Sequence, residues 1–154
     1  MMIAGLVGCD HATKHVARAA LGSGRVLTLV PGVLDLRYAE NRGTAFSVLE
    51  GARSPFTLAL LISLSAIALT SLGVWWWRRR HERAASQIGF AMIVGGAIGN
   101  LIDRAARGFV IDFVHLHHWP VFNVADVAIT AGVGLLLLDA LRRRREPAAT
   151  APPS

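Results

Sequence analysis

The sequence predicts an all-α membrane protein, a four-transmembrane-helix bundle with a small β-rich extracytoplasmic element. The first observation is composition: 53% of the 154 residues are hydrophobic and 17% are charged, against about 25% charged residues in ordinary soluble domains. The second is a set of long uncharged stretches, two of which end at runs of arginines. The third is the length of the chain. It fits one domain, but a chain of this length is too short to enclose a long apolar helix in a soluble core.

The positive charge is confined to two segments. Arginines at 78–80 and 83 form one run and those at 142–145 form the other, and together with Glu82 and Glu146 they account for the whole net charge of +6. A nucleic-acid-binding protein spreads its charge over a binding face, so no nucleic-acid partner is expected. Positive charge at the ends of apolar spans is typical of cytoplasmic loops, and membrane lipids are therefore expected partners.

Three apolar segments are long enough to cross a bilayer. Residues 56–77 would form a helix of about 33 Å at about 1.5 Å per residue, against a hydrocarbon core of about 30 Å. Residues 84–102 and 121–141 are the other two candidates. Within 84–102, Gly95 and Gly99 form a small-xxx-small pair, which allows the backbones of two helices to approach closely.

The start of the chain fits this pattern less well. Residues 1–9 are apolar, but ionisable residues follow from Asp10 onward, and so short a stretch cannot span a bilayer. We expect either a shallow insertion here or a natural start that lies upstream. If this segment enters from the inside, the chain crosses four times, with both termini in the cytoplasm and residues 20–55 and 103–120 outside.

The domain organisation is expected to be simple. Residues 1–141 form a single membrane-embedded domain. Within it, residues 20–55 form an outer excursion, because short alternating runs around Pro31 and Gly32 are typical of small strands. Residues 142–154 are expected to form a basic cytoplasmic end and a disordered tail rich in proline and alanine.

Two aspartates near the outer ends of the spans are the candidates for function, because a charge inside a membrane costs about 2.5–3.5 kcal/mol on insertion scales. The topology puts Asp112, in the loop 103–120, and Asp126, at the start of the last span, at the same surface. Two carboxylates that share a site hold one proton between them, which suits amide hydrolysis by water. The alternative is a non-enzymatic membrane protein, in which Asp112 caps a turn and Asp126 pairs with Arg104 or Lys14.

Three histidines near Asp112 raise the further alternative of a zinc peptidase. They are His115, His117 and His118. The chain contains no His-Glu-x-x-His helix, and the adjacent His117 and His118 cannot face the same side of a regular element. We therefore expect no metal site and no other cofactor. The single cysteine also excludes an intramolecular disulfide.

Five motifs occur in order along the chain. They are Asp10-His11-Ala12-Thr13-Lys14, Asn41-Arg42-Gly43-Thr44-Ala45-Phe46, Gly95-Gly96-Ala97-Ile98-Gly99-Asn100-Leu101-Ile102-Asp103-Arg104, Val110-Ile111-Asp112-Phe113 and Phe122-Asn123-Val124-Ala125-Asp126. Together they resemble the motifs of signal peptidase II, the bacterial lipoprotein signal peptidase family. The resemblance covers about residues 10–141.

The resemblance implies an intramembrane aspartic endopeptidase that cleaves the signal peptide from diacylglyceryl-modified prolipoproteins immediately before the lipidated cysteine. It implies that the catalytic pair is Asp112 and Asp126. It assigns substrate binding to Asn41, Asn100, Arg104 and Asn123, and a supporting role to Asp10, Lys14, Gly43 and Asp103. It also implies a bacterial cytoplasmic (inner) membrane location, an active site near the outer face and inhibition by globomycin-type peptides.

The chain departs from the family pattern in two places. His11 stands where the first motif of the family usually has glutamine, which is expected to alter a hydrogen bond near the site. Family members also usually carry a full apolar span before that motif, where this sequence has residues 1–9. The second departure bears on insertion into the membrane more than on chemistry.

Overall fold

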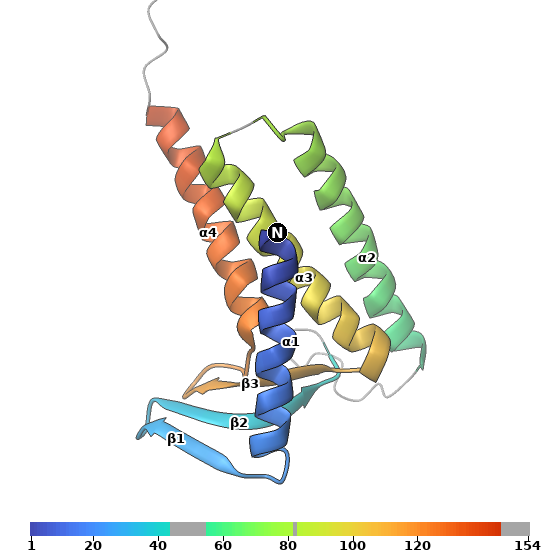
Figure 1. Ribbon diagram of the computed structural model, residues 1–154, viewed down its shortest axis with the longest axis vertical. Coiled ribbons are helices and arrows are strands. Elements are labelled where there is room, and N and C mark those ends of the chain that lie inside the picture. The colour runs from blue at the N-terminus through green and yellow to red at the C-terminus, as the bar shows by residue number, and fades with distance from the viewer. Residues whose placement is uncertain (44–54, 82, 146–154) are drawn as a thin grey trace, which may run out of the picture.

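The computed structural model describes residues 1–43, 55–81 and 83–145. In this part of the chain, four long helices lie side by side and a three-stranded antiparallel sheet lies at one end of them (Figure 1). The helices are α1 (Met2–Leu21), α2 (Pro55–Arg78), α3 (Ala84–Arg107) and α4 (Val124–Arg145). The strands are β1 (Val26–Val30), β2 (Leu34–Asn41) and β3 (Val110–Leu116), in that order across the sheet.

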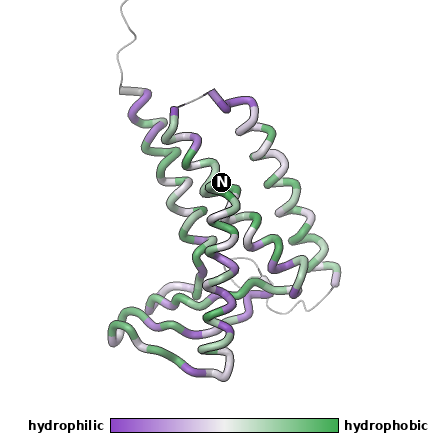
Figure 2. The backbone as a smooth tube through the Cα atoms, viewed as in Figure 1, coloured by the Kyte–Doolittle hydropathy of each residue, from purple (hydrophilic) through white to green (hydrophobic). Residues whose placement is uncertain are grey.

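Three of the described helices, α2, α3 and α4, are long and apolar enough to cross a membrane. They coincide with the three predicted spans, although α3 continues to Arg107 and α4 to Arg145. Figure 2 shows apolar residues along the helices and polar residues near the sheet and at the opposite ends of the helices. The three predicted spans are therefore confirmed as apolar helices.

Helix α1 differs from the expected fourth span. It is continuous from Met2 to Leu21, but it is not among the described helices that are apolar enough to cross a membrane. Its Asp10 and Lys14 are buried, and the helix packs mainly on α3 as it runs down to the sheet (Figure 1). Helix α1 therefore brings ionisable side chains into the interior of the bundle.

Glycines allow α3 to approach two neighbouring helices. Gly95 and Gly99 face α1, and a Cβ atom at Gly99 would lie 2.6 Å from Oδ2 of Asp10. Gly96 faces α4, where a Cβ atom would lie 2.4 Å from the backbone oxygen of Ala125. The predicted small-xxx-small pair is confirmed as a surface of close approach, and its partner is α1.

Strands β1 and β2 form a hairpin around the predicted turn. Gly32 has a φ of 73°, the left-handed conformation that a turn begun by a proline requires at its next position. The backbone N–H of Val33 closes the turn by donating to the carbonyl oxygen of Val30 at 3.0 Å. The small strands predicted around Pro31 and Gly32 are therefore confirmed.

The prediction of a loop over residues 103–120 is wrong for most of its length. Its first residues belong to α3, and Val110–Leu116 form β3, which pairs with β2 so that Asp112 lies opposite Ala39. The run around Asp112 is apolar on both sides, so it lacks the alternation that indicates a half-buried strand. Its partner strand, β2, is also distant in the sequence, so local sequence patterns do not predict the pairing.

A small apolar core holds the sheet against α1. Ala17 and Leu21 at the end of α1 pack against Phe113 of β3. Because Phe113 follows Asp112 directly, this contact fixes the position of the aspartate relative to α1.

Several predictions concern residues outside the described ranges. The segment 44–54 contains the end of the second motif, from Thr44 to Phe46, and part of the excursion 20–55. The predicted disordered tail also falls there, in 146–154.

Candidate active site

The two candidate aspartates come from different elements and meet where the sheet joins the bundle. Asp112 lies on β3, and Asp126 lies in the first turn of α4. Asp112 is 2% exposed, whereas Asp126 is half-buried. The predicted proximity of the two residues can be followed through their hydrogen bonds to shared asparagines.

Both carboxylate oxygens of Asp112 accept hydrogen bonds from amides. Nδ2 of Asn41, at the end of β2, donates to Oδ2 at 2.9 Å, and Nδ2 of Asn123 donates to Oδ1 at 2.7 Å. Burial raises the pKa of Asp112 to about 6, and the negative charge of Asp126 acts in the same direction. The two amides and the positive charge of Lys14 oppose this rise in pKa.

Asp126 and Asn123 form a reciprocal cap at the start of α4. The backbone N–H of Asn123 donates to Oδ2 of Asp126 at 3.1 Å, and the backbone N–H of Asp126 donates to Oδ1 of Asn123 at 3.0 Å. This is the geometry of a capping box, with asparagine and aspartate in place of the usual serine or threonine and glutamate. The positive end of the helix dipole therefore faces the carboxylate of Asp126.

Asn100 of α3 connects this cap to the first helix. Its Nδ2 donates to Oδ1 of Asp126 at 2.8 Å, and its Oδ1 accepts from Nδ2 of Asn123 at 3.1 Å and from Nζ of Lys14 at 3.0 Å. Asn123 is fully buried and uses its side-chain amide for both Asp112 and Asn100. Asn123 therefore bonds to both candidate aspartates, and Asn100 bonds to Asp126 and to Asn123.

Lys14 is fully buried between two carboxylates. Its Nζ lies 2.7 Å from Oδ2 of Asp10 and 2.8 Å from Oδ2 of Asp103, in addition to its bond with Asn100. These contacts use all three N–H groups of the ammonium. Lys14 therefore balances two buried negative charges and orients the side chain of Asn100.

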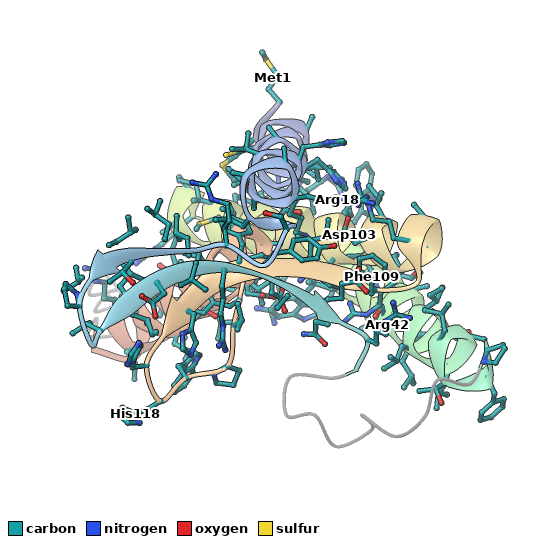
Figure 3. All side chains as sticks on the ribbon, turned by 90° about the horizontal axis from the view of Figure 1, so that it is seen from below. Met1, Arg18, Arg42, Asp103, Phe109 and His118 are labelled. Carbon is teal, nitrogen blue, oxygen red and sulfur yellow. The ribbon has the colours of Figure 1, made fainter. Side chains whose placement is uncertain are left out.

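The two carboxylates around Lys14 also hold backbone from neighbouring elements. Oδ1 of Asp10 accepts from the backbone N–H of Ala125 at 3.1 Å, in the first turn of α4. Oδ2 of Asp103, labelled in Figure 3, accepts from the backbone N–H of Ile111 on β3 at 3.3 Å. Arg107 forms an ion pair with the other oxygen of Asp103. The network thus attaches both aspartate-bearing segments to α1 and α3.

Gly43 explains why Asn41 points its amide nitrogen at Asp112. The backbone N–H of Gly43 donates to Oδ1 of Asn41 at 3.1 Å, so the other side-chain atom, Nδ2, faces the carboxylate. Next to them, the guanidinium of Arg42 lies 5.2 Å from the ring centroid of Phe109 (Figure 3). This cation–π contact holds the end of β2 near the end of α3.

Two other predicted residues lie at the edge of the network. Arg104 on α3 is half-buried, and its charge acts on Asp126 and Asp112. His11, the departure from the family pattern, has Nδ1 3.8 Å from Oδ1 of Asp103, and its Nε2 is buried without a hydrogen-bond partner among the described residues.

The partners expected for a non-enzymatic membrane protein are found only in part. This alternative expects Asp126 to pair with Arg104 or Lys14. Lys14 pairs with Asp10 and Asp103 instead, whereas the charge of Arg104 does act on Asp126. It also expects Asp112 to be a turn cap, whereas the capping aspartate is Asp126.

Metal-ligating side chains gather at a different place. Within the described residues, Asp35, His115 and His117 place one ligand atom each within 4.8 Å of one another. The sequence pattern did not predict this cluster, because the adjacent His117 and His118 argued against a shared ligand face. The sequence signal was the spacing of His115 and His117, two residues apart, and the pairing of β2 with β3 brings Asp35 to them.

The fold and the site together define a small helical membrane protein with a buried carboxylate at the junction of its helices and its sheet. The chain belongs to the signal peptidase II family, since the family model described as signal peptidase (SPase) II matches residues 2–142. Members of this family are peptidases, so the chain is a peptidase of the hydrolase class. The recognition made from the five motifs is thereby confirmed.

Individual relatives agree with this assignment. A lipoprotein signal peptidase of Geobacter metallireducens is 41% identical over 143 residues, which cover 88% of this chain and 85% of the relative. One of Solibacter usitatus is 37% identical over 143 residues, or 90% of this chain and 87% of the relative. A solved bacterial membrane enzyme superposes with a TM-score of 0.82 at 25% identity and covers 97% of this chain and 91% of its own.

Proposed function

We propose that this protein is an aspartic endopeptidase that removes signal peptides from diacylglyceryl-modified prolipoproteins, cutting immediately before the lipidated cysteine. The family membership and the names of the relatives support the substrate class. The observation that carries the aspartic mechanism is the position of Asn123. This residue donates its side-chain amide to Asp112 and its backbone N–H to Asp126, which puts the two carboxylates around one residue.

The two carboxylates have different environments, and this supports different roles. Asp112 is buried and its pKa is raised to about 6, so it is the carboxyl proposed to carry the proton in the active form of the pair. Asp126 lies at the N-terminus of α4, where the helix dipole favours a negative charge. Asp126 is therefore the general base and Asp112 the general acid.

The proposed reaction needs no covalent intermediate. Asp126 takes a proton from water as the oxygen attacks the carbonyl carbon of the scissile peptide, and Asp112 gives its proton to the carbonyl oxygen. The resulting tetrahedral diol then collapses. Asp112 takes a proton back from a diol hydroxyl, while Asp126 passes its proton to the leaving nitrogen of the cysteine. Both carboxyl groups return to their starting states.

The amides around the pair are proposed to hold the substrate and the aspartates in place. Asn41 is half-buried at the end of β2 and bonds to Asp112, and Arg104 supplies positive charge that acts on both aspartates. Asn100 and Asn123 position the carboxylates through the bonds described above. A supporting role is proposed for the residues that hold these amides and the neighbouring backbone, namely Asp10, Lys14, Gly43 and Asp103.

The membrane placement is also a proposal. The arginine runs favour the cytoplasm for the connection between α2 and α3 and for the end of α4, which lie away from the sheet. The sheet and the aspartates would therefore face the outer side of the inner membrane. Residues 1–141 would form one catalytic domain, with 142–154 as a cytoplasmic end. The acyl chains of the substrate would then lie in the bilayer beside the apolar helices.

A cleavage assay with purified protein in detergent tests the function. The substrate is a diacylglyceryl-modified prolipoprotein, and mass spectrometry of the product reports whether its N-terminus is the lipidated cysteine. We expect Asp112→Asn and Asp126→Asn each to lower the rate by about a thousandfold or more. Globomycin is expected to block cleavage by the unchanged protein.

Asp139→Asn is the matched control. Asp139 is also a buried aspartate of α4, but it bonds to Ser86 and Arg143 near the other end of the helix. This variant should retain cleavage. Activity retained in Asp112→Asn or Asp126→Asn would contradict the catalytic pair, and equal cleavage of an unlipidated substrate would contradict the substrate class.

A further inference from the structure

A second cluster of ionisable side chains lies at the far end of the β2–β3 ladder from Asn41. Asp35 is the direct cross-strand partner of His115, and His117 follows directly after β3 ends at Leu116. Nε2 of His117 lies 2.9 Å from Oδ2 of Asp35, and Nδ1 of His115 lies 3.7 Å from the same oxygen. Figure 3 shows His118, the next residue, at the opposite end of the sheet from Arg42.

The three ligand atoms have the spacing of a metal site. All of them lie within 4.8 Å of one another. Zn²⁺ binds imidazole nitrogen at about 2.0–2.1 Å and carboxylate oxygen at about 2.0–2.2 Å, which gives edges of about 3.3–3.5 Å in a tetrahedron. The two distances to Oδ2 of Asp35, 2.9 and 3.7 Å, fall on either side of this edge length. Small rotations of the side chains would therefore complete the coordination.

One ligand atom of the cluster lacks a hydrogen bond. Nδ1 of His115 is buried and has no hydrogen-bond partner among the described residues, since 3.7 Å to Asp35 is too long for a hydrogen bond. Buried polar atoms almost always have a partner. A cation held between His115 and Asp35 would supply one, and this observation points to a ligand independently of the spacing.

The backbone holds the cluster in place before any ion binds. The backbone N–H of His117 donates to the carbonyl oxygen of Val33 at 3.0 Å, which fixes the end of β3 against the hairpin turn. The side chain of His117 is 38% exposed, so an ion from solution can reach the cluster. A preformed and accessible set of two imidazoles and one carboxylate leaves a fourth position open to water.

We propose that Asp35, His115 and His117 bind a divalent transition-metal ion of the Zn²⁺ type. The site is distinct from the candidate active site, because its contacts join Asp35, His115 and His117 to one another at the end of the β2–β3 ladder away from Asn41. The ion would tie β2 to the segment that leads from β3 into Asn123, and its expected effect is to stabilise the sheet. This inference differs from the sequence expectation of no metal site and does not depend on the proposed peptidase mechanism.

Titration calorimetry with ZnCl₂ on the purified full chain, free of any histidine tag, tests the proposal. At pH 7.5, where an ordinary imidazole is neutral, we expect one equivalent of Zn²⁺ to bind. His115→Ala, His117→Ala and Asp35→Asn should each weaken binding at least tenfold. His118→Ala is the matched control, because it removes an adjacent histidine outside the cluster and should leave the affinity unchanged.

Two further measurements separate a metal site from a simple ion pair. Zn²⁺ should raise the melting temperature of the unchanged protein and of His118→Ala, but not that of Asp35→Asn. Co²⁺ in place of Zn²⁺ should give the visible absorption of a four-coordinate site, lost in His117→Ala. The absence of one-equivalent binding, or equal weakening by His118→Ala, would overturn the proposal and leave Asp35 as an ion-pair partner of the two histidines.

Discussion

Asn123 and Asp126 cap the first turn of α4 reciprocally, each donating its backbone N–H to the side chain of the other at 3.1 and 3.0 Å. The cap leaves the side-chain amide of Asn123 available for Asp112, to which it donates at 2.7 Å. A helix cap therefore also sets the position of two carboxylates relative to each other. Stability and activity should be separable at this residue.

Replacing Asn123 by serine or by alanine separates the two roles. Serine caps a helix about as well as asparagine but cannot donate an amide to Asp112, so Asn123→Ser should lose less stability than Asn123→Ala and still lower cleavage at least tenfold. Asn123→Ala should lose activity and also about 0.5–2 kcal/mol of stability. Thermal unfolding in detergent and the cleavage assay provide the two readouts. Full activity of Asn123→Ser would show that its amide is dispensable.

The pH dependence of cleavage should report the proton on Asp112. As general acid this residue must be protonated, and its pKa is about 6. The fraction of protonated Asp112 falls as the pH rises above this value, so kcat/KM should fall about tenfold per pH unit on the alkaline side. A rate that rises with pH through this range would argue against Asp112 as the acid.

Asn41→Ala should move this alkaline limb to higher pH. The amide of Asn41 donates to the carboxylate and favours its ionised form, so its removal raises the pKa of Asp112. The adjacent Glu40→Gln is the control, because Glu40 pairs with Arg42 at the exposed side and should leave the limb in place. kcat/KM measured from pH 5 to 9 distinguishes the shift in pH from a loss of substrate binding. If the alkaline limb of Asn41→Ala stays at the same pH, the amide of Asn41 does not act on the group that titrates.

Lys14→Met should destabilise the protein strongly. The change leaves Asp10 and Asp103 as buried carboxylates without their shared cation, for which about 3–5 kcal/mol of unfolding free energy is expected. Adding Asp103→Asn removes one of the two charges and should recover part of the loss. Denaturant titration in micelles measures both, with the exposed neighbour His15→Ala as a control that should change little. A Lys14→Met protein as stable as the control would contradict the charge balance.

Gly96→Ala should weaken the packing of α3 on α4. The added Cβ would meet the backbone oxygen of Ala125 at 2.4 Å, and a backbone atom cannot move aside cheaply. The cost is expected to be about 1–3 kcal/mol, with a loss of activity because Asp126 follows Ala125. Gly134→Ala on α4 meets no atom within 4 Å and should be neutral or slightly stabilising. Equal melting temperatures for the two variants would contradict the close approach.

The sequence was sufficient to predict the apolar helices, the hairpin turn at Gly32 and the family. Each of these depends on a local property: the hydropathy of a continuous segment, the conformational freedom of one glycine, or the order of short motifs. The motifs also identified the candidate site residues. The structure joins five of them in one hydrogen-bonded network, namely Asp112, Asp126, Asn41, Asn100 and Asn123. Their catalytic and binding roles stay predictions.

Only the tertiary structure decided how these residues are arranged. The apolar run around Asp112 gave no sign that it pairs with β2, because strand pairing depends on a partner distant in the chain. The pairing of Lys14 with Asp103 depends on the packing of α1 on α3, and the bond from Asn123 to Asp112 depends on the approach of β3 to the start of α4. Composition and spacing determine which groups enter the membrane-associated bundle, whereas the packing of the helices on the sheet determines which carboxyl is buried and which amides it contacts.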